Sequence, residues 1–146
     1  MSKQPTYPVI LNGKNYELRF DIQALTSAHA ALKALNFTRG TVWNLADAPY
    51  DLGEELILLQ AGLNGAKRLA KDSDFMSIDD VQELLDAHFD KMADDISKVE
   101  DEQEAMKEFQ KCQQDLMVAI SDAVKGAIGF RYKGKRDKPG KRGVDA

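Results

Sequence analysis

One segment near the N-terminus, YPVILNGKNYELRF, constrains the fold most, because it specifies both a β-hairpin and its register. Its centre, at positions 12–13, is Asn-Gly, the dipeptide that best adopts the positive φ angles of a two-residue hairpin turn. A turn there pairs Val9 with Tyr16, and the next pair outward on the same face is Tyr7 with Leu18. Strand alternation independently places these four side chains on one apolar face. Because an isolated hairpin is only marginally stable in water, we expect this face to pack on the helices that follow.

Apolar residues at helical spacing and residues that favour helix N-caps predict several helices after the hairpin. The first is expected to begin after Asp21 and to end near Asn36. Residues 37–50 are expected to be irregular or to contain a short helix around residues 42–46. The next helix begins after Asp51, and the Asn-Gly that lies 13 positions later is expected to end or bend it. A further helix begins after Ser77.

Apolar stripes also run along the helix after Asp51 and along a last helix, which is expected from about residue 96 to residue 124. The expected buried face of the former consists of Leu52, Leu56, Leu59 and Leu63. The apolar seam of the latter includes Met106 and Phe109, but Gln103, Gln110 and Gln113 interrupt it. A fully buried helix would not carry so many glutamines, so we expect one surface of a bundle or an oligomer contact.

The charge of the chain is divided between an acidic body and a basic C-terminal segment. Residues 125–146 hold eight Lys or Arg and two Asp, a net charge of +6, which leaves −10 for residues 1–124. Glycine, proline and few apolar side chains predict a disordered, flexible basic tail over residues 127–146. The predicted organisation is thus a mainly helical α+β domain, residues 1–126, with the N-terminal hairpin packed on a three- to four-helix bundle.

Residue types that carry catalysis or bind metals are few and scattered. His29 and His88 lie on separate helical stripes without a second ligand at i+3 or i+4, so each is expected to be a core residue with one hydrogen bond. The single cysteine, Cys112, has no nearby histidine in sequence to lower its pKa. We therefore expect a non-catalytic protein without a cofactor or metal, and no stretch is apolar enough to indicate a membrane partner.

Three stretches, in the order YPVILNGKNYELRFDIQAL, DLGEELILLQAGLNGA and MSIDDVQELLDAHFDKM, resemble the tail assembly chaperones of long-tailed phages and gene transfer agents. The resemblance covers about residues 7–93. It implies a non-catalytic protein of the host cytoplasm that is absent from the mature virion. Such a protein binds the helical tape measure protein and keeps it soluble while tail tube subunits polymerise around it. The tail tube protein and a second copy of this chain are further candidate partners.

The candidate partner-binding side chains are Trp43, Tyr50, Met106, Phe109, Phe130 and Tyr132. Large aromatic side chains in irregular segments are common interface anchors, although Trp43 and Tyr50 are equally suited to packing beneath the hairpin. Two other functions stay open: a structural minor tail or connector protein of the virion, and a nucleic-acid-binding regulator that uses the basic tail. Because the acidic body would repel a polyanion, nucleic acid is not an expected partner.

Overall fold

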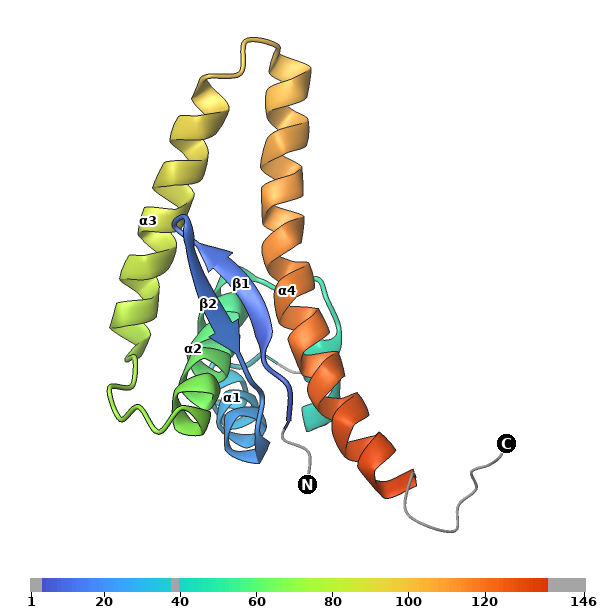
Figure 1. Ribbon diagram of the computed structural model, residues 1–146. Helices are drawn as coiled ribbons and strands as arrows, with labels where there is room; N and C mark the ends of the chain where they lie inside the picture. Colours follow the sequence, from blue (N-terminus) through green and yellow to red (C-terminus); the bar gives the residue numbers. More distant parts are fainter. Residues whose placement is uncertain (1–3, 38–39, 137–146) are drawn as a thin grey trace.

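The computed structural model describes residues 4–37 and 40–136, with side chains described as far as Phe130. In chain order its elements are β1 (Tyr7–Leu11), β2 (Lys14–Leu18), α1 (Ile22–Ala34), the 3-10 helix η1 (Val42–Ala46), α2 (Leu52–Leu69), α3 (Ile78–Ser97) and α4 (Glu102–Arg136). The predicted mainly helical α+β fold is confirmed, with an N-terminal two-stranded hairpin against a set of helices (Figure 1). Within the described ranges, no helix has the length and apolar character needed to span a bilayer.

The hairpin has the turn and the register that the sequence predicts. Both residues of its Asn-Gly turn have positive φ angles, 52° and 74°. Val9 pairs with Tyr16, and Tyr7 pairs with Leu18. The side chains on this face are buried or half-buried, whereas those on the opposite face are exposed. The apolar face of the hairpin therefore forms one wall of the core, as expected.

The helix starts predicted after Asp21, Asp51 and Ser77 are confirmed, because each of these N-cap residues lies one position before the first residue of its helix. Asp21 accepts a hydrogen bond from the N–H of Ala24, and Ser77 accepts one from that of Asp80. Asp51 forms a capping box at the start of α2. At the end of α1, Asn36 has a φ of 65°, the left-handed conformation typical of a helix stop.

The prediction that α2 ends or bends at residues 64–65 is wrong, because this helix continues to Leu69. Its glycines bring backbones together. A β-carbon on Gly65 would lie 1.9 Å from the carbonyl oxygen of Arg19, just after β2. The N–H of Arg19 donates to the carbonyl oxygen of Gly62 at 3.0 Å, and its guanidinium donates to that of Gly65 at 2.9 Å. Glycine at position 65 therefore allows the chain to cross directly over α2.

The buried face of α2 is only partly the predicted one. Leu59 and Leu63 are buried, but Leu52 is 55% exposed. Further buried residues of α2 are Glu54, Glu55, Ile57 and Leu58. The stripe is broader than predicted because α2 contacts α1, β2, α3 and α4, so more than one side of the helix is covered.

The last helix begins later and ends later than predicted. α3 continues to Ser97, and α4 begins at Glu102 because Asp101 accepts a hydrogen bond from the N–H of Gln103 at 3.0 Å. The acidic segment thus contains a helix start, not a continuous helix. The prediction of a disordered tail from residue 127 onward is also wrong for residues 127–136. These residues are helical, and Ala127 is buried in the core. Residues 137–146 lie outside those described.

Two antiparallel helices extend away from the core. The C-terminal part of α3 and the N-terminal part of α4 continue past the hairpin and are joined by a loop (Figure 1). Lower in the molecule, α4 lies against β1, where a β-carbon on Gly126 would come within 1.9 Å of the Tyr7 hydroxyl. The core is therefore concentrated around the hairpin, and the joined ends of α3 and α4 have fewer elements to cover them.

Candidate functional site: an apolar groove between α2, α3 and α4

An open groove of about 730 Å³ lies where α3 and α4 meet the beginning of α2. Its apolar lining consists of Pro49, Tyr50, Leu52, Phe89, Met92, Ala93, Phe109, Leu116 and Met117. Leu52 is 55% exposed and Phe109 is 40% exposed. Helical surface that would be buried in a closed bundle is therefore accessible to solvent here.

The two long walls of the groove follow from helical spacing. On α4, Phe109, Leu116 and Met117 are separated by seven and eight positions, which places them on one face. Across the groove, α3 contributes Phe89 and Met92, three positions apart. The walls are thus two apolar helix faces from segments that run antiparallel.

The floor is fixed by the segment that enters α2. The hydroxyl of Tyr50 donates to the carbonyl oxygen of Leu45 at 2.7 Å, and its backbone N–H points to the sulfur of Met117 at 3.5 Å. One residue on, the N–H of Asp51 donates to the Glu54 carboxylate at 2.9 Å, closing the capping box. These bonds hold the start of α2 against α4, so Leu52 and the residue one turn later, Glu55, line the groove.

Glu55 is the unusual residue of the groove. Its side chain is almost fully buried, at 8% exposure, and its carboxylate makes no hydrogen bond or ion pair among the described residues. Burial in this apolar site raises the pKa of Glu55 to about 7. The other charged residues that line the groove are Asp51 and Asp90, both acidic. The groove therefore combines apolar walls with an uncompensated negative group.

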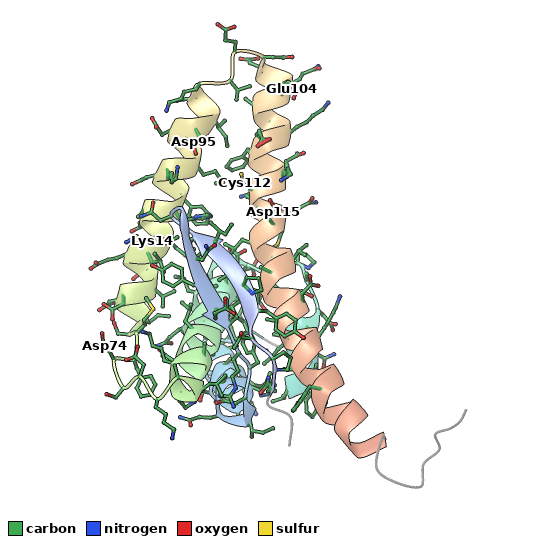
Figure 2. All side chains as sticks on the ribbon, in the orientation of Figure 1. Lys14, Asp74, Asp95, Glu104, Cys112 and Asp115 are labelled. Atoms are coloured by element: carbon green, nitrogen blue, oxygen red, sulfur yellow. The ribbon has the colours of Figure 1, made fainter. Side chains whose placement is uncertain are left out.

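The helices that border the groove are strongly acidic. Residues 78–116 contain 13 Asp or Glu and four Lys, a net charge of −9. Every one of these lysines lies within 4.0 Å of a carboxylate three or four positions away: Lys91–Asp95 at 3.4 Å, Lys98–Asp94 at 3.4 Å, Lys107–Glu104 at 3.9 Å and Lys111–Asp115 at 3.2 Å. Figure 2 labels Asp95, Glu104 and Asp115 along this part of the molecule. The excess of negative charge is therefore left without cations of its own.

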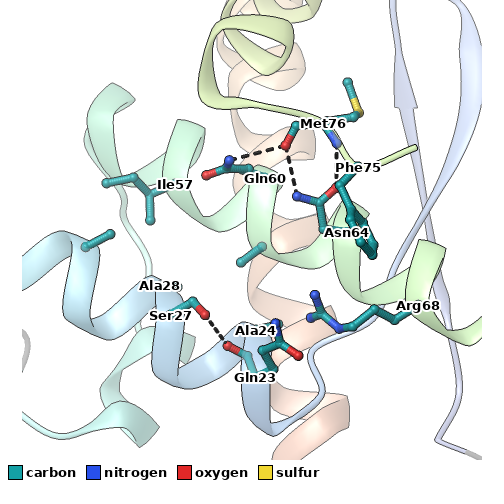
Figure 3. Close-up of a pocket in the computed structure, with 12 residues that line it drawn as sticks. Gln23, Ala24, Ser27, Ala28, Ile57, Gln60, Asn64, Arg68, Phe75 and Met76 are labelled. Atoms are coloured by element: carbon teal, nitrogen blue, oxygen red, sulfur yellow. Dashed lines mark hydrogen bonds between the residues drawn. The ribbon is translucent and has the colours of Figure 1, made fainter. Parts of the chain in front are cut away.

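A second hollow, of about 380 Å³ between α1 and α2, differs because several of the polar side chains that line it already have partners (Figure 3). Gln60 and Asn64 both donate to the carbonyl oxygen of Met76, at 3.2 Å and 2.9 Å. Arg68 makes two hydrogen bonds to Asp21, at 2.8 Å and 2.7 Å. These contacts tie α1, α2 and the following loop together, so we assign this hollow a structural role.

The structure separates the predicted partner-binding residues. Tyr50 and Phe109 both line the groove, although Tyr50 is buried and contributes mainly to its floor. Met106 is exposed on α4, one turn before Phe109. Trp43 is half exposed on η1, away from the groove lining. Phe130 is partly buried towards the other end of α4, and the side chain of Tyr132 lies outside those described.

Each histidine has one hydrogen-bond partner in the backbone, and the cysteine is a free thiol. His88 Nδ1 accepts a hydrogen bond from the N–H of Asn12 at 2.9 Å, and burial lowers the pKa of His88. His29 Nε2 lies 3.1 Å from the carbonyl oxygen of Gly40. Burial raises the pKa of Cys112, first among several causes, which favours the thiol over the reactive thiolate. In the part of the chain that the structure describes, no group of three His, Cys, Asp or Glu is placed to hold a metal ion.

Sequence reasoning missed the two features that define the groove, Leu52 on its rim and Glu55 inside it. Both lie in the run LGEELILL, which reads as one buried stripe when only helical spacing is considered. The signal available in the sequence was the second glutamate, because Glu54 alone completes the capping box.

No protein-family model, curated protein or solved structure matched this chain.

Proposed function

We propose that this protein is a tail assembly chaperone of a long-tailed phage, and that the groove between α2, α3 and α4 binds helical segments of the tape measure protein. The open apolar lining of the groove carries this proposal. An accessible apolar surface of this kind is typical of sites that bind other proteins. The sequence resemblance supplies the identity of the client.

The shape of the groove favours a helical client. Two apolar helix faces that lie side by side can accept a third amphipathic helix, whose residues at i, i+3, i+4 and i+7 fill the space between them. Phe89 on one wall is partly exposed and Phe109 on the other is 40% exposed, so both are accessible for such packing, while Met92 is buried. Tape measure proteins are long and largely helical, so many of their segments have this pattern.

The acidic surface supports the second part of the role, keeping the client in solution. Residues 78–116, which include α3 and the first part of α4 beside the groove, have a net charge of −9. Like charge on different complexes disfavours their aggregation. The openness of the groove also suits release, because a partly exposed interface can be exchanged for contacts with the tail tube protein as the tube grows.

Co-expression with the tape measure protein of the same phage tests the proposal. We expect the chaperone to move the tape measure protein from the insoluble to the soluble fraction, and the double variant Leu52→Ser/Phe109→Ser to lose this effect. The matched control is Ile22→Ser/Val118→Ser, since both side chains are exposed apolar residues outside the groove. Equal loss in both variants, or an insoluble tape measure protein with the unchanged chain, would contradict the proposal.

The resemblance also implies that the protein acts in the host cytoplasm and leaves the assembly before the virion is complete. Mass spectrometry of purified particles tests this, with a tail tube peptide as the positive control. Recovery of this chain in fixed proportion to the tube protein would instead indicate a structural component of the virion.

A further inference from the structure

We propose that the groove selects helices that carry an Arg or Lys beside their apolar stripe, and that the carboxylate of Glu55 pairs with this cation. The inference rests on the proposed function only in taking the groove as the site where the client binds. It defines the client by its chemistry: an amphipathic helix with a positive charge at one edge of the apolar face.

The position of Glu55 is the first step. This side chain lies one turn into α2, in the lining between Leu52 and the apolar faces of α3 and α4. It is 8% exposed, yet no other described residue donates a hydrogen bond to its carboxylate. Its oxygens are not among the fully buried atoms that have no partner, so the carboxylate reaches the groove and can accept hydrogen bonds from a ligand bound there.

The energetics favour a cation as that donor. Ionised carboxylates lose hydration when they are buried, and the raised pKa of Glu55, about 7, reflects this loss. A guanidinium or ammonium group that reaches the carboxylate would stabilise its charged form through a charge-assisted hydrogen bond. Because a helix in the groove would also exclude water, the pair would be screened less by salt than a surface pair.

The charged residues around Glu55 also favour a cationic ligand. Asp51 and Asp90 also line the groove, and no Lys or Arg is among its lining residues. The four lysines of residues 78–116 are already paired with carboxylates on α3 or α4. An anionic or neutral helix would bury the charge of Glu55 without a counter-ion, whereas a cationic helix would form an ion pair with it.

The experiment compares two synthetic amphipathic helical peptides that differ in one residue beside the apolar stripe, arginine or its neutral analogue citrulline. Binding to the full chain is measured by fluorescence anisotropy at pH 8, where Glu55 is ionised. We expect the arginine peptide to bind at least about tenfold more tightly than the citrulline peptide, as a charge-assisted hydrogen bond provides. In Glu55→Gln we expect the ratio to fall below about twofold, because the neutral amide keeps the shape of the side chain but not its charge.

The control variant is Glu83→Gln, which removes one negative charge from an exposed position of α3 outside the groove. It should keep the arginine preference. Repeating the measurement in 0.5 M salt separates a buried pair, whose preference persists, from general attraction by the acidic surface, whose preference disappears.

Three results would overturn the inference: equal binding of the two peptides by the unchanged chain, an arginine preference that survives in Glu55→Gln, or no binding of either peptide. The proposed function fails separately. If co-expression keeps the tape measure protein soluble while arginine and citrulline peptides bind equally, only the charge selection is wrong. If the peptides are distinguished but the tape measure protein stays insoluble, the groove is selective and its client is a different protein.

Discussion

Two carboxylates at opposite ends of α2, one next to the helix and one on it, have pKa values shifted in opposite directions. The carboxylate of Asp21, near the end of α2, accepts two hydrogen bonds from Arg68. It also accepts one from Arg19 at 3.3 Å. Burial alone would raise the pKa of Asp21, but the hydrogen bonds from Arg68 and Ala24 and the nearby cations lower it below its ordinary value. Glu55, near the beginning of the same helix, has only the effect of burial, and its pKa is raised.

The opposite pKa shifts of Asp21 and Glu55 distinguish a region that stabilises the fold from a region that is open to a partner. Around Asp21 the hairpin, α1 and α2 approach closely, and the Asp21 carboxylate is paired with Arg68 and Arg19 within the chain. Around Glu55, α2, α3 and α4 leave an apolar groove and an unpaired acid. Removing a partner from the first region should therefore destabilise the fold, whereas neutralising Glu55 should stabilise it.

The largest effect is expected at the closest contact of the stable region. In Gly65→Ala the new methyl group would lie 1.9 Å from the backbone oxygen of Arg19, which cannot rotate away. We expect α2 and the chain after β2 to separate, with a loss of about 4 kcal/mol of unfolding free energy, measured by urea denaturation. Gly129→Ala is the control, because nothing lies within 4 Å of its new methyl group. It should stabilise α4 by about 1 kcal/mol. Similar effects at both positions would show that the region around Arg19 is loosely packed.

The next effect is the pH dependence that Glu55 gives to the unfolding free energy. Its folded-state pKa, about 7, lies above the ordinary value of 4.5, so the folded chain binds its proton more tightly than the unfolded chain does. Stability from this group is complete below pH 4.5 and is lost as the pH rises through 7. The loss is on the order of 3 kcal/mol by pH 8.

Urea denaturation of Glu55→Gln at pH 5 and pH 8 measures this contribution. Relative to the unchanged chain, the variant should gain on the order of 2 to 3 kcal/mol at pH 8 and little at pH 5. A variant that is less stable at pH 8 would reveal a cationic partner for Glu55 within the chain. Both Glu55 and Asp21 would then be carboxylates paired inside the fold.

The paired acid should behave in the opposite way. Asp21→Asn keeps an N-cap for α1 but removes the charge that Arg68 binds, so we expect a loss of about 2 kcal/mol at pH 7. Because the pKa of Asp21 is lowered, its contribution is present above the ordinary value of 3.8 and fades as the pH falls through the folded-state value. The variant and the unchanged chain should therefore converge in acid. The control is Asp86→Asn, at an exposed position of α3, which should change the unfolding free energy by less than about 0.5 kcal/mol both at pH 7 and in acid.

Most of the stable region could be predicted from the sequence. The hairpin register follows from a two-residue turn and strand alternation, and the helix starts follow from Asp21, Asp51 and Ser77, all of them local signals. The role of Gly65 could not be predicted in this way. A glycine that ends a helix and a glycine that admits a crossing backbone look alike until the neighbour is known.

The groove was less predictable because it depends on which helix faces remain uncovered. Leu52 and Leu59 belong to the same sequence pattern, but one is exposed and the other is buried. The break before α4 was missed since Asp101 is one carboxylate in an acidic run, and only its hydrogen bond to the N–H of Gln103 marks the helix start. Helical spacing indicates which residues are apolar on one face, but not whether the chain itself supplies the surface that covers them.

The smallest effect on stability is expected from the groove rim. Leu52 is 55% exposed and lines the groove, and Val118 is 53% exposed on α4 outside it. Because more than half of each side chain already contacts water, Leu52→Ser and Val118→Ser should each lower the unfolding free energy by less than about 1 kcal/mol. Urea denaturation of the two variants tests this equality. A loss above about 2 kcal/mol for Leu52→Ser alone would mean that Leu52 packs as a core residue and that the groove is closed in solution. Equal, small losses would instead mean that the fold does not need this leucine, which leaves its apolar surface available to a partner.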